Sequence, residues 1–161
     1  MKIRLFRPED TEQIAQLFHD TVREINRRDY SESQVQAWAP DDIYFRDWEQ
    51  VCSSRFTVVA EQAGAIAGFA QLEPNGHIDC FYCHKHYQRQ GVGIRLYEAI
   101  EAQAQQLRLP RLFTEASMTA KPFFQRLGFS VLKEQQVARR GETFTNYAME
   151  KRLANPLIID D

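Results

Sequence analysis

The N-terminal part of the chain shows a strand pattern followed by helical spacing. Residues 2–7 alternate as in a strand, and Pro8 breaks the pattern. Asp10 can cap a helix, because Gln13 follows it at the spacing of a capping box. The apolar residues of this helix recur three or four positions apart, at Ile14, Leu17, Phe18, Val22 and Ile25.

Two shorter helical segments follow before the periodicity changes. Ser31 and Gln34 give a second capping signal, which opens a short helix that ends before Pro40. Residues 42–52 predict one more helical stretch.

The middle of the chain has the periodicity of strands. Residues 56–60 and 65–72 are typical of two strands joined around Gly64. The turn signal Pro74-Asn75-Gly76 then brings residues 77–83 back antiparallel to the preceding strand. We therefore expect a meander of three strands.

The last part of the chain combines a long helix with further strands. Residues 93–107 place apolar side chains on one helical face, and Pro110 ends the helix. Arg140-Gly141 is the predicted turn of a β-hairpin. The other expected elements are a strand at 111–116, a short helix at 122–127, and hairpin strands at 129–139 and 143–150.

Together these elements predict an α/β (α+β) fold, with a mixed, mostly antiparallel sheet of about seven strands flanked by helices. At 161 residues the chain can bury one hydrophobic core. We expect a single domain over residues 1–153 and a loosely held tail at 154–161. The composition, 43% hydrophobic and 26% charged, is typical of globular rather than disordered proteins.

Charge and cysteine content narrow the class of partner. The net charge of -2 gives no general attraction to nucleic acid or to an anionic membrane. The N-terminus lacks an apolar run of signal-peptide length, and no apolar run reaches the roughly 18 residues of a membrane span. The three cysteines are an odd number, which favours reduced thiols. We therefore expect a cytoplasmic protein that binds neither nucleic acid nor membranes.

The segment Gln88-Arg89-Gln90-Gly91-Val92-Gly93 lies between a predicted strand and the long helix. A helix start binds anions through its free N–H groups and its dipole, and glycines let a phosphate approach the backbone. No Lys-Ser or Lys-Thr follows, so this is not a nucleotide P-loop, and Leu96 replaces the third glycine of a dinucleotide fingerprint. From these residues alone, an ordinary tight turn is the alternative.

This segment resembles the Gln/Arg-x-x-Gly-x-Gly/Ala pattern with which the GNAT superfamily of N-acetyltransferases holds the pyrophosphate of acetyl-CoA. Residues 81–87 are similar to the family's strand-end segment, and residues 116–129 to its Ala-Ser-x-x-Ala-x-x-Phe-Tyr-x-x-x-Gly-Phe signature. The resemblance covers residues 2–151. It implies a sheet splayed after the fourth strand, acetyl-CoA as cosubstrate, no metal, and a primary amine of a small molecule or peptide as acceptor. Dimers are common among the relatives, which leaves a homodimer open.

The resemblance also implies which residues contact the cofactor. They are Phe81, Tyr82, Cys83, Gln88, Arg89, Gln90, Gly91, Val92, Gly93, Ile94, Ser117, Lys121 and Phe124. The backbone of Phe81 and Cys83 would pair with the pantetheine arm like an added strand, and the Phe81 N–H would stabilise the thioester oxyanion. Ser117 has an alternative role as the cap of the short helix after it.

His77 and Asp79 are the candidate proton acceptors, because acyl transfer needs a neutral amine. Strand alternation would put the side chains of His77, Asp79 and Phe81 on one face. A histidine that merely stands beside a tight turn is the alternative. Glu73 and Glu115 are further carboxylates that could face the acceptor, although the register that decides this is open.

Many relatives have a tyrosine at the position of Phe124, where it acts as the acid for the departing thiolate. Phe124 has no hydroxyl, so Tyr82 or Tyr147 protonates the sulfur, or the thiolate takes its proton from water. Tyr82 is expected to point away from Phe81, which weakens its case.

Residues 20–50 are expected to cover the acceptor end of the cleft. They carry Tyr30, Trp38, Tyr44, Phe45, Trp48, Glu32, Asp41, Asp42 and Asp47. Aromatic rings beside acids, Trp38 among them, suit a cationic amine. The same pattern fits a plain amphipathic helix packed on the sheet.

Two other functions compete with acetyl transfer. Cys80-Phe81-Tyr82-Cys83-His84 formally matches the attachment motif of a c-type haem and also suggests a metal site, but an extended strand directs the two thiols to opposite faces. The second alternative is a non-catalytic acyl-CoA-binding sensor of the same fold, which the missing hydroxyl at Phe124 would suit.

Overall fold

The computed structural model describes residues 1–154, so the predicted tail lies almost wholly outside the described residues. Seven strands form two antiparallel sheets, which confirms the predicted mixed fold and its strand number. The first sheet has the order β1 (Lys2–Leu5), β2 (Phe56–Gln62), β3 (Ala65–Leu72) and β4 (Ile78–Cys83). The second has the order β5 (Arg111–Ser117), β7 (Glu142–Arg152) and β6 (Ser130–Arg139).

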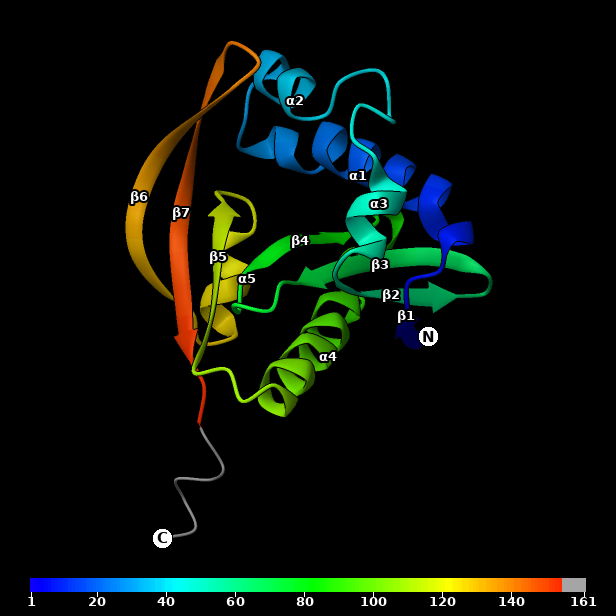
Figure 1. Ribbon diagram of the computed structural model, residues 1–161. Helices are drawn as coiled ribbons and strands as arrows, with labels where there is room; N and C mark the ends of the chain where they lie inside the picture. The colour runs from blue at the N-terminus through cyan, green and yellow to red at the C-terminus, as the bar shows by residue number, and fades with distance from the viewer. Residues whose placement is uncertain (155–161) are drawn as a thin grey trace, which may run out of the picture.

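Helices cover both faces of the first sheet (Figure 1). The helices α1 (Thr11–Glu24), α2 (Glu32–Trp38) and α3 (Trp48–Ser53) lie on one face, and α4 (Val92–Gln106) packs on the other. The short helix α5 (Lys121–Arg126) lies beside β5, and 3-10 turns occupy residues 8–10, 26–28 and 85–87. No helix among the described residues is both long and apolar enough to cross a membrane.

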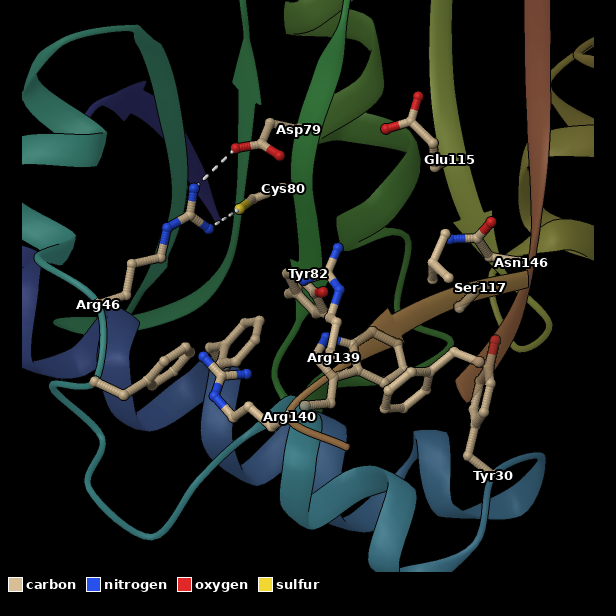
Figure 2. Close-up of a pocket in the computed structure, with 15 residues that line it drawn as sticks. Tyr30, Arg46, Asp79, Cys80, Tyr82, Glu115, Ser117, Arg139, Arg140 and Asn146 are labelled. Carbon is tan, nitrogen blue, oxygen red and sulfur yellow. Dashed lines mark hydrogen bonds and ion pairs between the residues drawn. The ribbon is translucent and has the colours of Figure 1, made fainter. Parts of the chain in front are cut away.

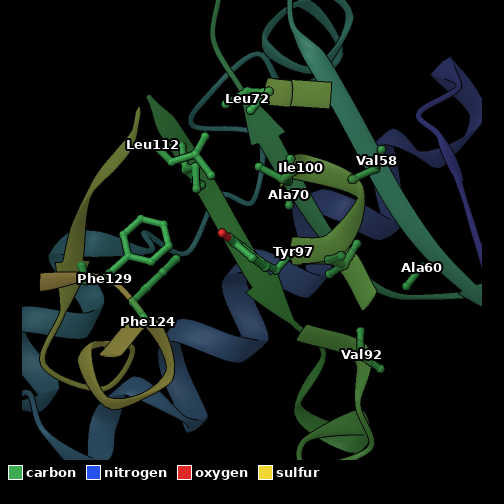
Figure 3. Packing of buried hydrophobic residues seen from close by; sticks show 14 of the residues in the cluster. Val58, Ala60, Ala70, Leu72, Val92, Tyr97, Ile100, Leu112, Phe124 and Phe129 are labelled. Atoms are coloured by element: carbon green, nitrogen blue, oxygen red, sulfur yellow. The ribbon is translucent and has the colours of Figure 1, made fainter. Parts of the chain in front are cut away.

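The first sheet separates two hydrophobic clusters, because neighbouring side chains of a strand point to opposite faces. Val58 belongs to the cluster under α4, whereas Val59 belongs to the cluster under α1. Figure 3 shows the cluster under α4, which extends to Phe124 near the second sheet. The helix α4 lies very close to β3, since a Cβ added at Gly68 would stand 2.9 Å from the Leu96 side chain.

The third helix differs from the sequence expectation. It begins at Trp48 rather than near residue 42, with the Asp47 carboxylate accepting the Gln50 N–H (3.2 Å) as its cap. The Asp42 carboxylate instead accepts the Tyr44 N–H (2.9 Å), which holds the preceding segment in a local turn. Residues 39–46 are therefore loop, and they reach over the sheet rather than packing as a helix.

Candidate functional site

The strands β4 and β5 begin side by side and then part. Near their starts, the Phe113 N–H donates to the Gly76 carbonyl (3.0 Å) and the Thr114 hydroxyl donates to the Ile78 carbonyl (2.8 Å). A β-bridge between His77 and Phe113 links the sheets at the same end. Beyond it β4 is an edge strand, which confirms the predicted splay after the fourth strand (Figure 1).

A cavity of about 500 Å³, here called the gap cavity, lies between the parted strands and the start of α4. It is lined by most residues with a predicted cofactor contact, namely Phe81, Tyr82, Cys83, Gln88, Arg89, Gly91, Val92, Gly93, Ile94, Ser117 and Phe124. Gln90 does not line it, because its amide donates to the His86 carbonyl (3.3 Å). Lys121 does not line it either, since its ammonium lies 4.2 Å from the centre of the Tyr147 ring.

The start of α4 borders the gap cavity with unpaired N–H groups. Gly91 is its N-cap with a φ of 79°, a left-handed conformation that glycine adopts without strain, and no side chain caps the helix. The first N–H groups of a helix have no intrahelical acceptor and favour an anion. Gly93 packs against Phe123, whose ring a Cβ at residue 93 would approach to 2.9 Å. Three arginines also line this cavity, namely Arg28, Arg89 and Arg126.

The free edge of β4 faces the gap cavity. The His84 N–H donates to the Ala67 carbonyl of β3 (2.7 Å), and bonded pairs alternate along an antiparallel ladder. The N–H groups of Phe81 and Cys83 therefore point away from β3, toward the gap. The Cys83 carbonyl on this edge accepts the side-chain amide of Gln88 (2.7 Å).

A second cavity of about 420 Å³, here called the hairpin cavity, lies beneath the β6–β7 hairpin (Figure 2). Its aromatic lining consists of Phe18, Tyr30, Trp38, Phe45, Tyr82 and Phe144. Of the other predicted aromatic residues, Tyr44 is exposed and Trp48 is buried in the core. The predicted acids of residues 20–50 line neither cavity. Three arginines that the sequence did not indicate as acceptor-site residues line the hairpin cavity instead, namely Arg46, Arg139 and Arg140.

The two cavities meet at a junction. The residues that line both are Trp38, Asp79, Tyr82, Glu115 and Ser117. The Ser117 hydroxyl accepts the Ala120 N–H (3.0 Å) in the turn before α5, whose N-cap is Ala120 rather than Ser117, and Ser117 lines both cavities. The junction holds the two carboxylates Asp79 and Glu115, on opposite sides of the gap in Figure 2.

A β-bulge interrupts β4 next to the junction. Ala70 pairs with Phe81 and Leu72 pairs with Ile78, so β4 has one residue more than β3 over this stretch. Ile78 and Phe81 consequently pack in the same hydrophobic cluster, although strict alternation would separate them. Asp79, within the bulge, lines both cavities.

His77 lies outside both cavities, although its ring and the Asp79 carboxylate bring atoms within 4.8 Å of each other. Phe81 packs with Ile78 instead, so the predicted common face holds for His77 and Asp79 and is wrong for Phe81. Its Nδ1 is 2.8 Å from the Glu73 carboxylate and its Nε2 is 2.7 Å from the Glu115 carboxylate. The hydrogen bond to Glu115 and then that to Glu73 outweigh burial and raise the pKa of His77 to about 9. His77 is therefore an imidazolium at neutral pH, already protonated. Glu73 lines neither cavity and is linked to the junction through His77, which bonds Glu115, and through Arg55, which pairs with both Glu73 (3.8 Å) and Asp79.

Two arginines hold the carboxylate of Asp79. Arg46 donates to it at 3.0 Å, and Arg55 forms a second ion pair with the same oxygen. Burial alone would raise the pKa of Asp79, but the hydrogen bonds from Arg55 and Arg46 bring that pKa below its usual value. Asp79 is a firmly ionised carboxylate with little affinity for a proton.

The tyrosines proposed as proton donors lie in different places. Tyr147, on β7, lines neither cavity, and its ring packs under the ammonium of Lys121. Tyr82 lies at the junction, although it packs in the cluster opposite that of Phe81, as predicted. Burial raises the pKa of Tyr82 well above its usual range, so the hydroxyl keeps its proton. Phe124 is buried among other aromatic rings.

The thiols of the haem-like motif point apart. Cys80 packs in the cluster under α1, and Cys83 packs against the cluster under α4, as the strand pattern predicted. Glu73, His77 and Asp79 bring potential metal-binding atoms within 4.8 Å of one another. Both nitrogens of His77 and the carboxylate of Asp79 are already hydrogen-bonded within the protein.

Comparison with known proteins agrees with this geometry. Residues 26–151 match the family model described as an acetyltransferase (GNAT) domain. The uncharacterized N-acetyltransferase YafP of Escherichia coli (strain K12) is 32% identical over 149 residues, which cover 92% of this chain and 94% of YafP. The crystal structure of a GCN5-related N-acetyltransferase from Rhodopseudomonas palustris is similar with a TM-score of 0.88 and 32% identity, over 94% of this chain and 95% of that one.

A more distant relative carries the cofactor. The Salmonella typhimurium protein yncA, a putative acetyltransferase solved with acetyl-CoA, has a TM-score of 0.67 and 18% identity, over 96% of this chain and 94% of its own. At this identity the likeness shows the fold alone. The match to the family model and the 32% identity to YafP decide the family, and the chain belongs to the GNAT acetyltransferases.

Proposed function

We propose that the protein transfers the acetyl group of acetyl-CoA to a primary amine. The junction is the observation that carries this proposal, because it joins two cavities beside a free backbone donor, the Phe81 N–H, and a carboxylate, Glu115. The names of the relatives support N-acetylation, and the acetyl-CoA bound to the Salmonella protein supports the cosubstrate. The free thiols of Cys52, Cys80 and Cys83 suit the proposed cytoplasmic location.

The gap cavity fits the chemistry of coenzyme A. The unpaired N–H groups at the start of α4 suit the pyrophosphate, and Arg28, Arg89 and Arg126 add charge for the phosphates. The free edge of β4 suits the amides of the pantetheine arm, which would extend the sheet as one more strand. In this arrangement the hydrogen bond from the Gln88 amide to the Cys83 carbonyl would break, so that the carbonyl could accept an amide N–H of the pantetheine arm.

The residues of the junction divide the work of acyl transfer. The Phe81 N–H stabilises the charge that develops on the thioester oxygen. Glu115 holds the incoming ammonium and accepts its proton, because His77 is already protonated and Asp79 is held by arginines. The neutral amine nitrogen then bonds to the carbonyl carbon as the carbon–sulfur bond breaks, and the second proton that this nitrogen loses to become an amide passes to water. The thiolate takes its proton from water, since Phe124 has no hydroxyl and a thiol is acidic enough to leave ionised. Glu115 thus replaces His77 and Asp79 as the proposed proton acceptor.

The test is the release of coenzyme A thiol from acetyl-CoA with a panel of primary amines, together with mass spectrometry of the products. We expect amine-dependent thiol release and a product heavier by one acetyl group. An acylated amine without thiol release, or thiol release with no acylated amine, would contradict direct transfer.

A non-catalytic acyl-CoA sensor is the second candidate, because Phe124 supplies no proton to the sulfur. The same assay separates the two functions. Tight binding of acetyl-CoA without amine-dependent turnover for any member of the panel would decide for the sensor.

A further inference from the structure

Arg139, an exposed residue, differs from the other two arginines of the hairpin cavity in its hydrogen bonding. Arg46 is engaged by Asp79 (3.0 Å), and Arg140 donates to the Ala37 carbonyl (2.7 Å). Within residues 1–154 no hydrogen-bond partner faces the guanidinium of Arg139, which lies at the end of β6. In Figure 2 this side chain rises into the middle of the cavity.

The charges around the junction leave Arg139 unbalanced. The carboxylates of Glu73, Asp79 and Glu115 are matched in number by three cations, the guanidinium groups of Arg46 and Arg55 and the imidazolium of His77. Arg139 adds positive charge beyond this set. An acceptor that carried only an ammonium would meet repulsion from Arg139 and would leave its donors unused.

Position along the cavity separates the two ends of an acceptor. Glu115 lines both cavities, so it stands where the amine must meet the thioester. Arg139 lines the hairpin cavity alone, further from the gap. Asn146 of β7 lines the same cavity, and its buried side-chain oxygen, an acceptor, has no partner among the described residues, so it is available to an N–H or O–H donor of a ligand. Aromatic rings such as those of Trp38 and Phe144 form the walls of the hairpin cavity between Glu115 and Arg139.

On the basis of the proposed function, we infer that the acceptor is an amine that carries its own acidic group on an apolar body, as an amino acid with an aromatic or branched side chain does. The ammonium lies at Glu115 and the acidic group forms paired hydrogen bonds with Arg139, whose planar fork matches a carboxylate or a phosphonate. The apolar body packs on the aromatic wall, within a volume of about 420 Å³.

The test uses matched acceptors that differ only in the acidic group. Phenylalanine is compared with phenylalanine amide, with phenethylamine and with the aminophosphonate analogue, in the thiol-release assay. We expect kcat/KM to be about 10- to 100-fold higher for the acceptors with an acidic group. Arg139→Gln should remove this preference, whereas Lys133→Gln, which removes an exposed cation elsewhere on β6, should retain it. The phosphonate decides between a carboxylate site and a wider oxyanion site.

Binding to the coenzyme A complex, followed by tryptophan fluorescence because Trp38 lines the cavity, gives a readout that does not need turnover. Equal binding of phenylalanine to the wild type and Arg139→Gln, or equal use of phenethylamine and phenylalanine, would overturn the inference while acetyl transfer stood. If no amine is turned over, the proposed function fails, and the binding comparison still decides the role of Arg139.

Discussion

His77 Nε2 and Glu115 Oε1 lie 2.7 Å apart, and this bond joins β4 to β5 just before the two strands separate. The same imidazole is bonded to Glu73 on its other side. An imidazolium that is hydrogen-bonded through both ring nitrogens fixes the orientation of the Glu115 carboxylate, and it contacts only one of the two carboxylate oxygens. If Glu115 accepts the proton as proposed, His77 would act through Glu115, as a positioning residue.

The pKa of His77 gives the first testable prediction. Because that pKa is about 9 in the folded protein and 6.5 when unperturbed, its ion pairs stabilise the fold fully below pH 6.5 and lose their effect as the pH rises through about 9. His77→Gln should lower the free energy of unfolding by about 2 kcal/mol at pH 6 and by little at pH 10, after allowance for solvent screening. Urea unfolding at both pH values measures this. The exposed His86→Gln serves as control, and an equal loss at both pH values would count against the ion pairs.

Removing the charge of Glu115 should impair catalysis. Glu115→Gln keeps the size of the side chain but cannot accept a proton, so we expect kcat to fall by about 100-fold or more. The KM for acetyl-CoA should change little, because the predicted phosphate contacts lie at α4. Steady-state kinetics with both substrates measures this, and the exposed Glu98→Gln on α4 is the matched control. Retention of the full rate by Glu115→Gln across pH would show that another group takes the proton.

The close packing of Gly93 predicts a defect in cofactor binding. Gly93→Val places a Cβ about where the Phe123 ring now lies, and Phe123 lines the gap cavity. We expect the Kd for coenzyme A, measured by calorimetry, to rise by at least about 10-fold as the ring shifts. Ala102→Val adds the same side chain at an exposed position of α4 and should leave the Kd unchanged. Equal affinity in Gly93→Val would mean that Phe123 moves without affecting the site.

Restoring the hydroxyl at residue 124 tests whether protonation of the thiolate limits the rate. Phe124 is surrounded by Phe81 and Phe129, so the added hydroxyl of Phe124→Tyr must find a partner or lower stability by about 1 kcal/mol. We expect kcat to change by less than about 2-fold, because the thiolate leaves without an acid. An increase of about 10-fold would show that the departing sulfur gains from a proton donor.

The cysteine thiols should be unreactive. Burial raises the pKa of Cys52 and of Cys83 to about 11 and that of Cys80 to about 12. In the folded protein at pH 7.5, alkylation by iodoacetamide should be at least about 100-fold slower than in urea, as followed by mass spectrometry. Rapid labelling of Cys80 at this pH would indicate a thiolate in the hairpin cavity and would contradict this prediction.

Much of the fold could be predicted from local pattern. The capping signals at Ser31 and the Arg140-Gly141 turn match α2 and the hairpin, because each depends on a few neighbouring residues. The segment proposed to hold the cofactor was predicted in the same way, since Gly91 and Gly93 are separated by one residue and both lie at the start of one helix. The third helix was misplaced because Asp42 and Asp47 are both able to cap, and the choice depends on Trp48 burying its ring in the core.

The residues proposed for the acceptor site could be predicted only in part, because contacts between distant segments bring them together. Glu115 and Trp38 were named among the candidates, but Arg139 gave no signal, since an arginine next to a hairpin turn is ordinarily a solvated residue. The place of His77 depends on its hydrogen bond to Glu115, which lies 38 positions later in the sequence. The predicted alternation of side chains failed between Asp79 and Phe81, because the pattern of polar and apolar residues in so short a strand does not reveal a bulge.

That bulge has a consequence for how the strand can vary in length. The bulge determines which face of the sheet each side chain takes before it, at His77 and Ile78, relative to the side chains after it, from Phe81 to Cys83. Removing one residue between Ile78 and Phe81 would let the strand alternate regularly, with Ile78 and Phe81 still facing the cluster under α4 and the earlier side chains still on their present faces. Only one of Asp79 and Cys80 would remain, and its side chain would face α1. A single-residue deletion within the bulge would therefore change the junction while the His77–Glu115 bond and the edge of β4 that faces the gap kept their places.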